Sequence, residues 1–496
     1  MTIEHFDVVI VGAGLSGIGA GHHLQTNCKD RSYVILEGRE TIGGTWDLFR
    51  YPGIRSDSDM YTLGYAFKPW TEAKAIADGP SILKYVRDTA HDEGIERHIR
   101  FGCQVKSAAW SSEDAAWTVE AQRGGETVTF TCNFLFLCGG YYNYAGGFTP
   151  DFAGTAAFQG QIIHPQKWPE ALDYAGKRVV VIGSGATAVT LVPEMAKTAA
   201  HVTMLQRSPT YVVSRPAEDA FANKLRARLP AKLAYSIIRW RNVLFGMFFF
   251  RLARRKPEQV KKNIIDMVRA QLGPDYDIET HFTPRYNPWD QRLCLVPDAD
   301  LFEALKSGAA SVVTDQIETF TATGLKLKSG AELAADIVVT ATGLNLQVLN
   351  GMSLTVDGRK VEPAKTLSYK GMMYSDVPNL ASSFGYTNAS WTLKCDLTCE
   401  YVCRLLNHMK KTGLRQATPR NTDPNMGELP WLDFSSGYVT RGIAAFPKQG
   451  DRAPWKLHQN YALDLMNLKY ASVADGVMEF SNPKGARAKV AQKAAA

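Results

Sequence analysis

Two glycine-rich loops are the residues of this chain best suited to bind a phosphorylated cofactor. The first, GAGLSG at residues 12–17, follows the apolar run 6–11 and precedes a helical stretch over 18–25. In that setting the first glycine permits a tight turn, the second lets a pyrophosphate approach the backbone, and the third lets the helix pack on the strand. The phosphates then meet the positive end of the helix dipole. The predicted ligands from this loop are Gly12, Gly14, Ser16 and Gly17.

An acidic residue and a second glycine cluster follow the first loop. A strand over 32–36 ends at Glu37, where a carboxylate would bind ribose hydroxyls. Residues 43–57 are polar and glycine-rich, in the place where a simple NAD domain would hold another helix. Such a segment suggests that the bound cofactor extends beyond its ADP half, which indicates FAD. The alternative is that the segment is a plain surface loop. The further predicted FAD contacts are Gly44, Thr45, Trp46, Asp47, Arg55, Asp57 and Val105.

The second loop, GSGATA at residues 183–188, has the same setting, with an apolar strand before it and a helix after it. The next strand, 201–205, ends in Gln206-Arg207-Ser208 rather than in an acid. An arginine there accommodates a 2′-phosphate through charge and paired hydrogen bonds. This site therefore favours NADP, although Arg207 is also compatible with a solvated charge at a strand end. The predicted NADP contacts are Gly183, Ser184, Gly185, Ala186, Thr187, Arg207 and Ser208.

These loops require elements that position them, and the pattern predicts an α/β fold with two Rossmann-like dinucleotide-binding domains. The FAD domain is expected to be discontinuous, over 1–165 and 336–483, because an apolar strand ending in Ala-Thr-Gly at 341–343 resembles a crossing back to it. The NADP domain is expected over 166–335, with a helical insertion at about 217–290. Residues 484–496 are rich in Lys and Ala and are expected to form a flexible tail.

Composition narrows the class of protein. A chain of 496 residues exceeds one ordinary core, and a net charge of +7 suits anionic cofactors without demanding nucleic acid. The eight cysteines contain no CxxC pair, which argues against a disulfide framework and a zinc ribbon. No signal peptide is visible, so a reducing, cytoplasmic setting is expected. Cys395, Cys399 and Cys403 share one face of a predicted helix and are interpreted as small core residues rather than metal ligands.

The apolar run VLFGMFFF at 243–250, flanked by arginines, is open to three interpretations. It is too short to span a bilayer. A buried helix of the insertion is the favoured interpretation. A lid over an apolar substrate channel and a patch that enters a membrane surface are the alternatives.

FAD and NADP together, without a redox cysteine pair, exclude disulfide reduction of the usual kind. Oxygen chemistry is the main remaining option. NADPH reduces the flavin, O2 adds to it, and the resulting peroxyflavin transfers one oxygen atom. The cofactor performs the difficult chemistry, while the protein supplies orientation, charge and exclusion of water.

One segment between the two loops resembles a family signature. Phe158, Gly160, His164, Trp168 and Pro169 fit FxGxxxHxxxWP, which is typical of type I Baeyer–Villiger monooxygenases. GGTW at 43–46 and RYPGIRSD at 50–57 are also similar to that family. Two longer stretches, GGTWDLFRYPGIRSDSDMYTLG at 43–64 and YNPWDQRLCLVP at 286–297, resemble the branch of this family that activates ethionamide in mycobacteria. The likeness covers nearly the whole chain.

The resemblance implies roles for individual residues. Arg292 matches the arginine that lies by the flavin and stabilises the peroxyflavin anion, and Asp57 matches the acid that pairs with it. An arginine suits that role because its guanidinium stays protonated. His164 resembles a residue at the domain connection that does not touch substrate. Gln291 stands where many members have a lysine that helps hold the 2′-phosphate, which leaves that task to Arg207.

The expected activity is insertion of one oxygen atom beside the carbonyl of apolar ketones, giving esters or lactones, with sulfoxidation as a side activity. A heteroatom monooxygenase acting on sulfur or nitrogen, or a non-catalytic flavin-binding sensor, are the alternatives. The expected partners are a small apolar ketone or sulfide and O2, with no nucleic acid. A peripheral contact with the inner face of the cell membrane is included as an alternative to a purely cytoplasmic location.

Overall fold

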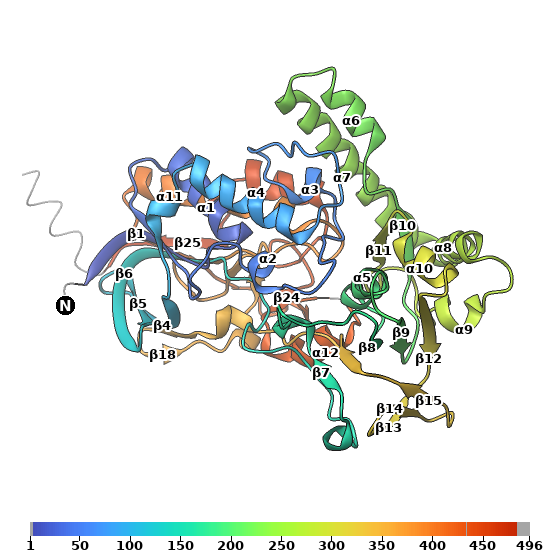
Figure 1. Cartoon of the computed structure of the whole chain (residues 1–496). Coiled ribbons are helices and arrows are strands. Elements are labelled where there is room, and N and C mark those ends of the chain that lie inside the picture. The colour runs from blue at the N-terminus through green and yellow to red at the C-terminus, as the bar shows by residue number, and fades with distance from the viewer. Residues whose placement is uncertain (1–2, 433, 484–496) are drawn as a thin grey trace, which may run out of the picture.

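A computed structural model describes residues 3–432 and 434–483, which form two α/β units built on separate sheets (Figure 1). The first sheet has nine strands in the order β18-β17-β4-β5-β6-β1-β2-β3, with β21 also paired to β6. Its strands are β1 (Glu4–Val11), β2 (Tyr33–Leu36), β3 (Ile99–Arg100), β4 (Gln104–Ser111), β5 (Ala116–Arg123), β6 (Glu126–Leu137), β17 (Ser353–Val356), β18 (Arg359–Lys360) and β21 (Leu380–Ser382).

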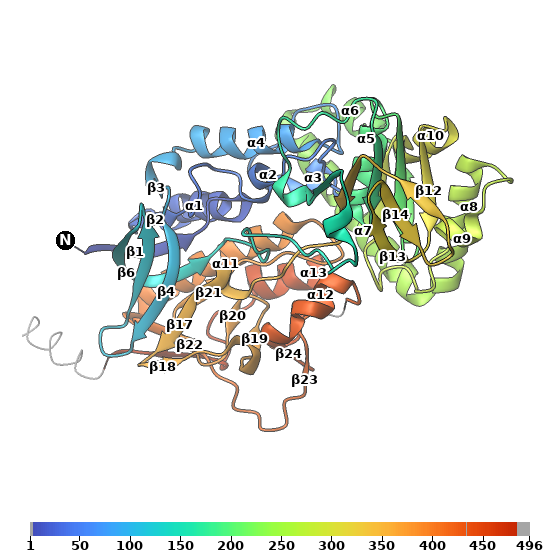
Figure 2. The same cartoon turned by 60° about the horizontal axis from the view of Figure 1, so that its bottom comes forward.

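The centre of the first sheet is parallel and covered on both faces. In β1, Val8, Val9 and Ile10 are fully buried, and the strand pairs in parallel with β2 on one side and β6 on the other. Continuous apolar runs are typical of such strands, because neither face meets water. Helices α1 (Leu15–Asn27) and α11 (Trp391–Thr412) pack against each other over one face, so the C-terminal part of the chain returns to this unit (Figure 2).

The second sheet has five parallel strands in the order β12-β9-β8-β16-β7. They are β7 (Gln161–Ile163), β8 (Arg178–Ile182), β9 (His201–Gln206), β12 (Ala310–Thr314) and β16 (Ile337–Thr340). The predicted boundaries at 165/166 and 335/336 cut through this sheet, because β7 and β16 both lie outside 166–335. Strand β16 pairs with β8 on one edge and β7 on the other, so the chain enters and leaves the second unit through neighbouring strands.

The insertion is helical, as its sequence indicates. It contains α6 (Ala220–Arg226), α7 (Ala231–Arg255), α8 (Pro257–Leu272) and α9 (Ile278–Phe282), between the paired strands β10 (Val212–Arg215) and β11 (Cys294–Pro297). Helices α6 and α7 stand out from the body of the molecule beside α3 (Met60–Leu63) (Figure 1). The favoured interpretation of 243–250 as a buried helix is wrong for one face, because Leu244, Phe245 and Phe248 are 57%, 52% and 64% exposed.

The remaining elements complete the two units. They are α2 (Thr45–Leu48), α4 (Gly79–Asp92), α5 (Ala186–Met195), α10 (Asp300–Lys306), β13 (Ile317–Thr321), β14 (Gly324–Leu327), β15 (Glu332–Ala334), β19 (Ser368–Tyr369), β20 (Met373–Tyr374), β22 (Gln416–Pro419), β23 (Glu428–Pro430), β24 (Lys448–Gly450), β25 (Met478–Ser481), α12 (Gly437–Gly442) and α13 (Tyr461–Asp464).

The three cysteines of α11 are buried, as predicted for core residues. Within the described residues no helix is long and apolar enough to cross a membrane. The predicted tail at 484–496 lies outside the described residues.

Candidate active site

The first glycine loop is closed so tightly that side chains cannot replace its outer glycines. Gly12 has a φ of +99°, and a Cβ there would lie 2.7 Å from the Cα of Gly139. A Cβ on Gly17 would overlap the carbonyl oxygen of Gly12. By contrast, the nearest atom to a Cβ on Gly14 is the Cα of Gly44, at 3.5 Å. Two glycines therefore leave a slot walled by backbone, which fits a pyrophosphate at the N-terminus of α1.

Glu37 stands at this loop, at the end of β2. Its Oε2 accepts a hydrogen bond from the backbone N–H of Ala13 at 2.6 Å, and its Oε1 accepts one from that of Arg39 at 2.9 Å. Burial raises the pKa of the Glu37 carboxyl, against the opposing effect of these two donors. The side chain is thus fixed beside the loop, where ribose hydroxyls are expected.

Several predicted FAD contacts also hold the protein together. The Ser16 hydroxyl accepts a hydrogen bond from Trp391 Nε1 at 2.8 Å, which joins α1 to α11. Asp47 is buried and forms ion pairs with three arginines, Arg39, Arg50 and Arg87. These contacts give both residues a structural task, and their contact with FAD stays a prediction.

The other predicted FAD contacts lie in three different settings. Arg55 pairs with Asp300 of α10, so it ties the first unit to the second. Thr45 lies 3.4 Å from the hydroxyl of Tyr144, and Trp46 packs partly buried against the first core. Val105 is buried within the first sheet's core. The side chain of Val105 is therefore enclosed by the core, and its contact with FAD stays a prediction.

The second glycine loop has an open centre. Gly183 has a φ of +136°, and a Cβ there would overlap the carbonyl of Ala341, whereas a Cβ on Gly185 would meet no atom within 4 Å. Gly185 precedes Ala186 and Thr187, the first residues of α5, so the free amides of that helix face this space. The space suits a phosphate.

Arg207 lies next to this loop at the end of β9. Ser184 Oγ donates to the carbonyl oxygen of Ser208 at 3.1 Å, which fixes the strand end against the loop. The Arg207 side chain is exposed and, within the described residues, makes no ion pair with an acid. The side chain is therefore accessible, and its contact with a 2′-phosphate stays a prediction.

Arg292 and Asp57 come together although 235 positions separate them in the chain. Arg292 Nη1 donates to Asp57 Oδ2 at 2.8 Å. The negative charge of Asp57 raises the pKa of Arg292 further above its ordinary value, so the guanidinium stays protonated. The side chains are 36% and 30% exposed, which leaves the cation accessible to a ligand.

Three tyrosines near Arg292 were missed by sequence reasoning. Tyr141 and Tyr142 follow the glycine pair at the end of β6, and their hydroxyls lie 2.9 Å apart. Burial raises the pKa of Tyr141, Tyr142 and Tyr438, so all three stay neutral beside the arginine. The position of the first two at the carboxyl end of a central strand was an available signal. The sequence contains no comparable signal for Tyr438, which lies on α12.

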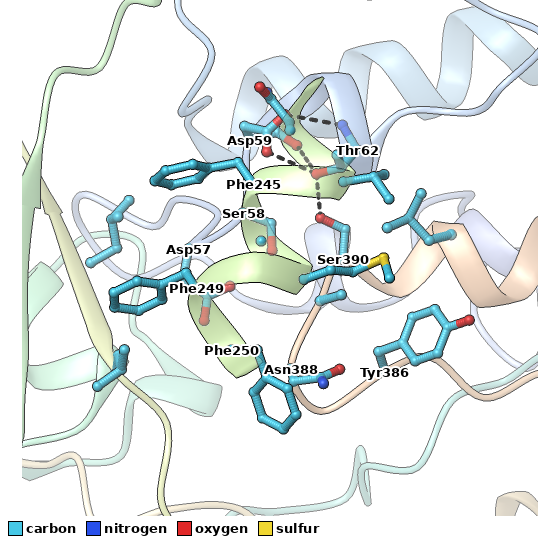
Figure 3. Close-up of a pocket in the computed structure, with 18 of the residues that line it drawn as sticks. Asp57, Ser58, Asp59, Thr62, Phe245, Phe249, Phe250, Tyr386, Asn388 and Ser390 are labelled. Carbon is cyan, nitrogen blue, oxygen red and sulfur yellow. Dashed lines mark hydrogen bonds between the residues drawn. The ribbon is translucent and has the colours of Figure 1, made fainter. Parts of the chain in front are cut away.

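The Asp57–Arg292 pair forms part of the wall of a cavity of about 880 Å³. Helix α7 contributes Phe245, Phe249 and Phe250 to one side (Figure 3). The opposite side is more polar and includes Ser390, whose hydroxyl lies 2.6 Å from that of Thr62. The cavity therefore offers an apolar chamber with a permanent cation at its wall.

His164 lies at the connection between the units, as the resemblance implied. Its Nε2 is 3.1 Å from the carbonyl oxygen of Gly343, and its Nδ1 accepts from the backbone N–H of Gln166 at 3.1 Å. Nε2 is therefore the protonated nitrogen that donates to Gly343. Burial lowers the pKa of His164, which keeps the ring neutral. His164 does not line the cavity.

Comparisons with known proteins agree with this geometry and define a flavin-dependent monooxygenase. Residues 73–241 match the flavin-binding monooxygenase-like family, and residues 10–75 match the NAD(P)-binding Rossmann-like domain. The FAD-containing monooxygenase EthA of Mycobacterium tuberculosis is 55% identical over 479 residues, covering 96% of this chain and 98% of that protein. EthA of Mycolicibacterium smegmatis is 53% identical over 484 residues, covering 97% and 98%. The chain belongs to the family of FAD-containing monooxygenases.

Solved structures share the fold. Oxidized steroid monooxygenase bound to NADP superposes with a TM-score of 0.76 at 22% identity, covering 96% of this chain and 100% of that one. The open crystal structure of cyclohexanone monooxygenase has a TM-score of 0.69 at 23% identity, covering 84% and 90%. The predicted fold class, with FAD and NADP as the cofactor pair, is confirmed.

Proposed function

We propose that this protein is an NADPH- and O2-dependent FAD monooxygenase that inserts oxygen beside the carbonyl of apolar ketones. One atom of O2 enters the C–C bond next to the carbonyl and gives an ester or lactone. The other atom leaves as water. NADPH supplies one hydride, which carries both electrons, solvent supplies one proton, and NADP+ is released. The observation that carries the proposal is the Asp57–Arg292 ion pair at the wall of an apolar cavity.

The two glycine loops would hold the cofactors. Gly12, Gly14, Gly17 and Glu37 would bind FAD, and the loop at 183–188 with Arg207 would bind NADPH. Bound FAD supplies the electron transfer from NADPH and the activation of O2. The chain itself holds these groups in place and excludes water.

Arg292 would stabilise the negative charge that develops during oxygen transfer. A fixed cation in a site shielded from water acts without reorganising, and arginine suits this because it does not deprotonate. Asp57 would orient the guanidinium through their 2.8 Å hydrogen bond. The hydroxyls of Tyr141 and Tyr142 are neutral, so they make the site polar without adding a negative charge that would offset the positive charge of Arg292.

The cavity supports an apolar substrate. Its volume and the phenylalanines of α7 favour a molecule with a large hydrocarbon part. One fold neighbour is named for a steroid and another for cyclohexanone, an apolar ketone, and these names support an apolar substrate.

Product analysis tests the substrate class. We expect the purified enzyme with NADPH and O2 to convert an apolar ketone to its ester and, as a side reaction, an alkyl aryl sulfide to the sulfoxide. Gas chromatography with mass spectrometry of both incubations distinguishes the products. Sulfoxide without any ester, over a series of ketones, would assign the protein to the heteroatom monooxygenases. Failure of NADPH to bleach the flavin in stopped-flow mixing would indicate a sensor.

The role of Arg207 can be tested through cofactor preference. Arg207→Ala should raise the KM for NADPH by roughly 10- to 100-fold, as expected for loss of a charged hydrogen bond, and leave the KM for NADH nearly unchanged. Arg178→Ala is a matched control, because Arg178 is an exposed arginine on the neighbouring strand β8, paired with Asp336 at 2.7 Å. Equal changes in both KM values would contradict the 2′-phosphate assignment.

A further inference from the structure

The outer face of α7 is apolar along its length. Leu233, Ile237, Trp240, Leu244 and Phe248 follow one another at intervals of three or four residues, which places them on a single face of the helix. Each side chain is between 40% and 64% exposed. Helices α6 and α7 together hold seven of the fourteen exposed large hydrophobic residues in the described part of the chain. An apolar stripe of this extent marks an interaction surface.

Positive charge surrounds this stripe. Residues 220–262 contain twelve Lys or Arg residues and one acidic residue, Glu258, whereas the whole chain has 56 and 49. Eight of these cations make no ion pair within the described residues. They are Lys224, Arg226, Arg228, Lys232, Arg251, Arg255, Lys256 and Lys261. The surface therefore suits a partner that is both apolar and anionic.

The inner face of α7 holds this surface in a fixed orientation. Arg239 is buried, and its Nη1 donates to the carbonyl oxygens of Tyr61 at 2.9 Å and Gly64 at 2.7 Å. Its Nη2 lies 3.4 Å from Asp396 of α11. A buried ion pair with these additional hydrogen bonds anchors the helix to the first unit. The outer stripe is thus presented without rearrangement, on a hairpin that projects from the body (Figure 1).

We propose that the outer face of α6 and α7 docks on an anionic phospholipid bilayer and that the cavity opens into it. Phe221 and Phe245 are 48% and 52% exposed, and both also line the cavity. Arg241 lies 4.7 Å from the centre of the Phe221 ring, and Arg215 lies 5.2 Å from that of Phe245. The cavity mouth thus carries aromatic rings with cations above them, an arrangement suited to the lipid headgroup region.

The charge of this face favours lipid over a second copy of the chain. A symmetric dimer through α7 would place the same unpaired cations opposite one another. A bilayer containing anionic lipids meets both features, since acyl chains accept the apolar stripe and headgroups neutralise the cations. This inference rests on the proposed function for one point, namely that apolar ketones dissolved in the bilayer would enter the cavity directly.

Vesicle flotation with the full-length FAD-loaded enzyme tests the docking. We expect binding to phosphatidylcholine vesicles that contain phosphatidylglycerol, weaker binding to pure phosphatidylcholine, and release at high salt. The double variant L244S/F248S should bind at least about tenfold more weakly. The control L429S/M466S changes two exposed residues elsewhere, 43% and 58% exposed, and should bind normally. The flavin absorption spectrum establishes that each variant is folded.

A fluorescent label gives an independent readout. All eight native cysteines are buried, so Phe248→Cys can be labelled selectively with a polarity-sensitive dye. We expect its emission to shift to the blue on adding anionic vesicles. No shift, or equal vesicle binding by L244S/F248S and its control, would overturn the proposal. So would a dimer in sedimentation velocity that L244S/F248S abolishes. Neither Leu244 nor Phe248 lines the cavity, so turnover of a water-soluble ketone by L244S/F248S tests the proposed function separately.

Discussion

Arg292→Ala is expected to abolish ester formation while NADPH still reduces the flavin. The guanidinium is the cation that would stabilise the negative charge arising at oxygen transfer, and removing one such donor from a preorganised site typically costs about 10²–10³ in kcat. In the variant, Asp57 loses its 2.8 Å partner and its negative charge faces the site instead. We expect NADPH consumption to continue with hydrogen peroxide as the product of O2, measured by a peroxidase-coupled assay beside ester quantification.

Two further variants separate charge from geometry. Arg292→Lys keeps the positive charge but offers no planar fork, so we expect partial recovery of ester formation. Arg420→Ala removes an arginine of similar exposure, 38%, from its pair with Asp376 at 2.6 Å in the C-terminal part of the chain. This change should leave turnover intact. Ester formation by Arg292→Ala at the rate of Arg420→Ala would remove Arg292 from the reaction.

The parts of the site that sequence predicts well are those fixed by backbone geometry over a few residues. Gly12 and Gly17 could be placed because a strand, a turn and a helix follow one another directly. Arg207 could be placed because the ends of neighbouring parallel strands meet at one edge of the sheet. The pairing of Asp57 with Arg292 is different in kind. It came only from the family resemblance, since local pattern does not bring together residues 235 positions apart.

The rest of the site depends on how distant segments pack, which local pattern does not encode. Tyr438 reaches the arginine from α12, and Ser390 reaches the cavity from the start of α11. The run at 243–250 was expected to be buried because it is almost entirely apolar. A helix that packs against the protein through one face exposes its opposite face to solvent, even when the residues there are apolar. The exposure of Phe248 could therefore be established only from the structure.

Gly17→Ala is expected to prevent stable folding of the FAD unit. A Cβ there would overlap the carbonyl oxygen of Gly12 and lie 3.0 Å from the carbonyl carbon. Both are backbone atoms of the turn between β1 and α1, so no side chain can move aside, and α1 must shift away from the sheet. Alanine gains about 1 kcal/mol in helix propensity over glycine, which offsets only part of an overpacking cost of roughly 3 kcal/mol or more. Loss of bound FAD and a lower unfolding temperature measure the effect.

Gly185→Ala is the matched control, because the same methyl group added to the second loop meets no atom within 4 Å. Its backbone is extended, with a φ of −79°, so alanine adopts it without strain. This variant should keep its FAD and its unfolding temperature. The methyl would instead occupy the space where a phosphate approaches the backbone, so the KM for NADPH should rise by about tenfold. If Gly17→Ala and Gly185→Ala retained FAD equally well, the tight closure of the first loop would not be what holds the flavin unit together.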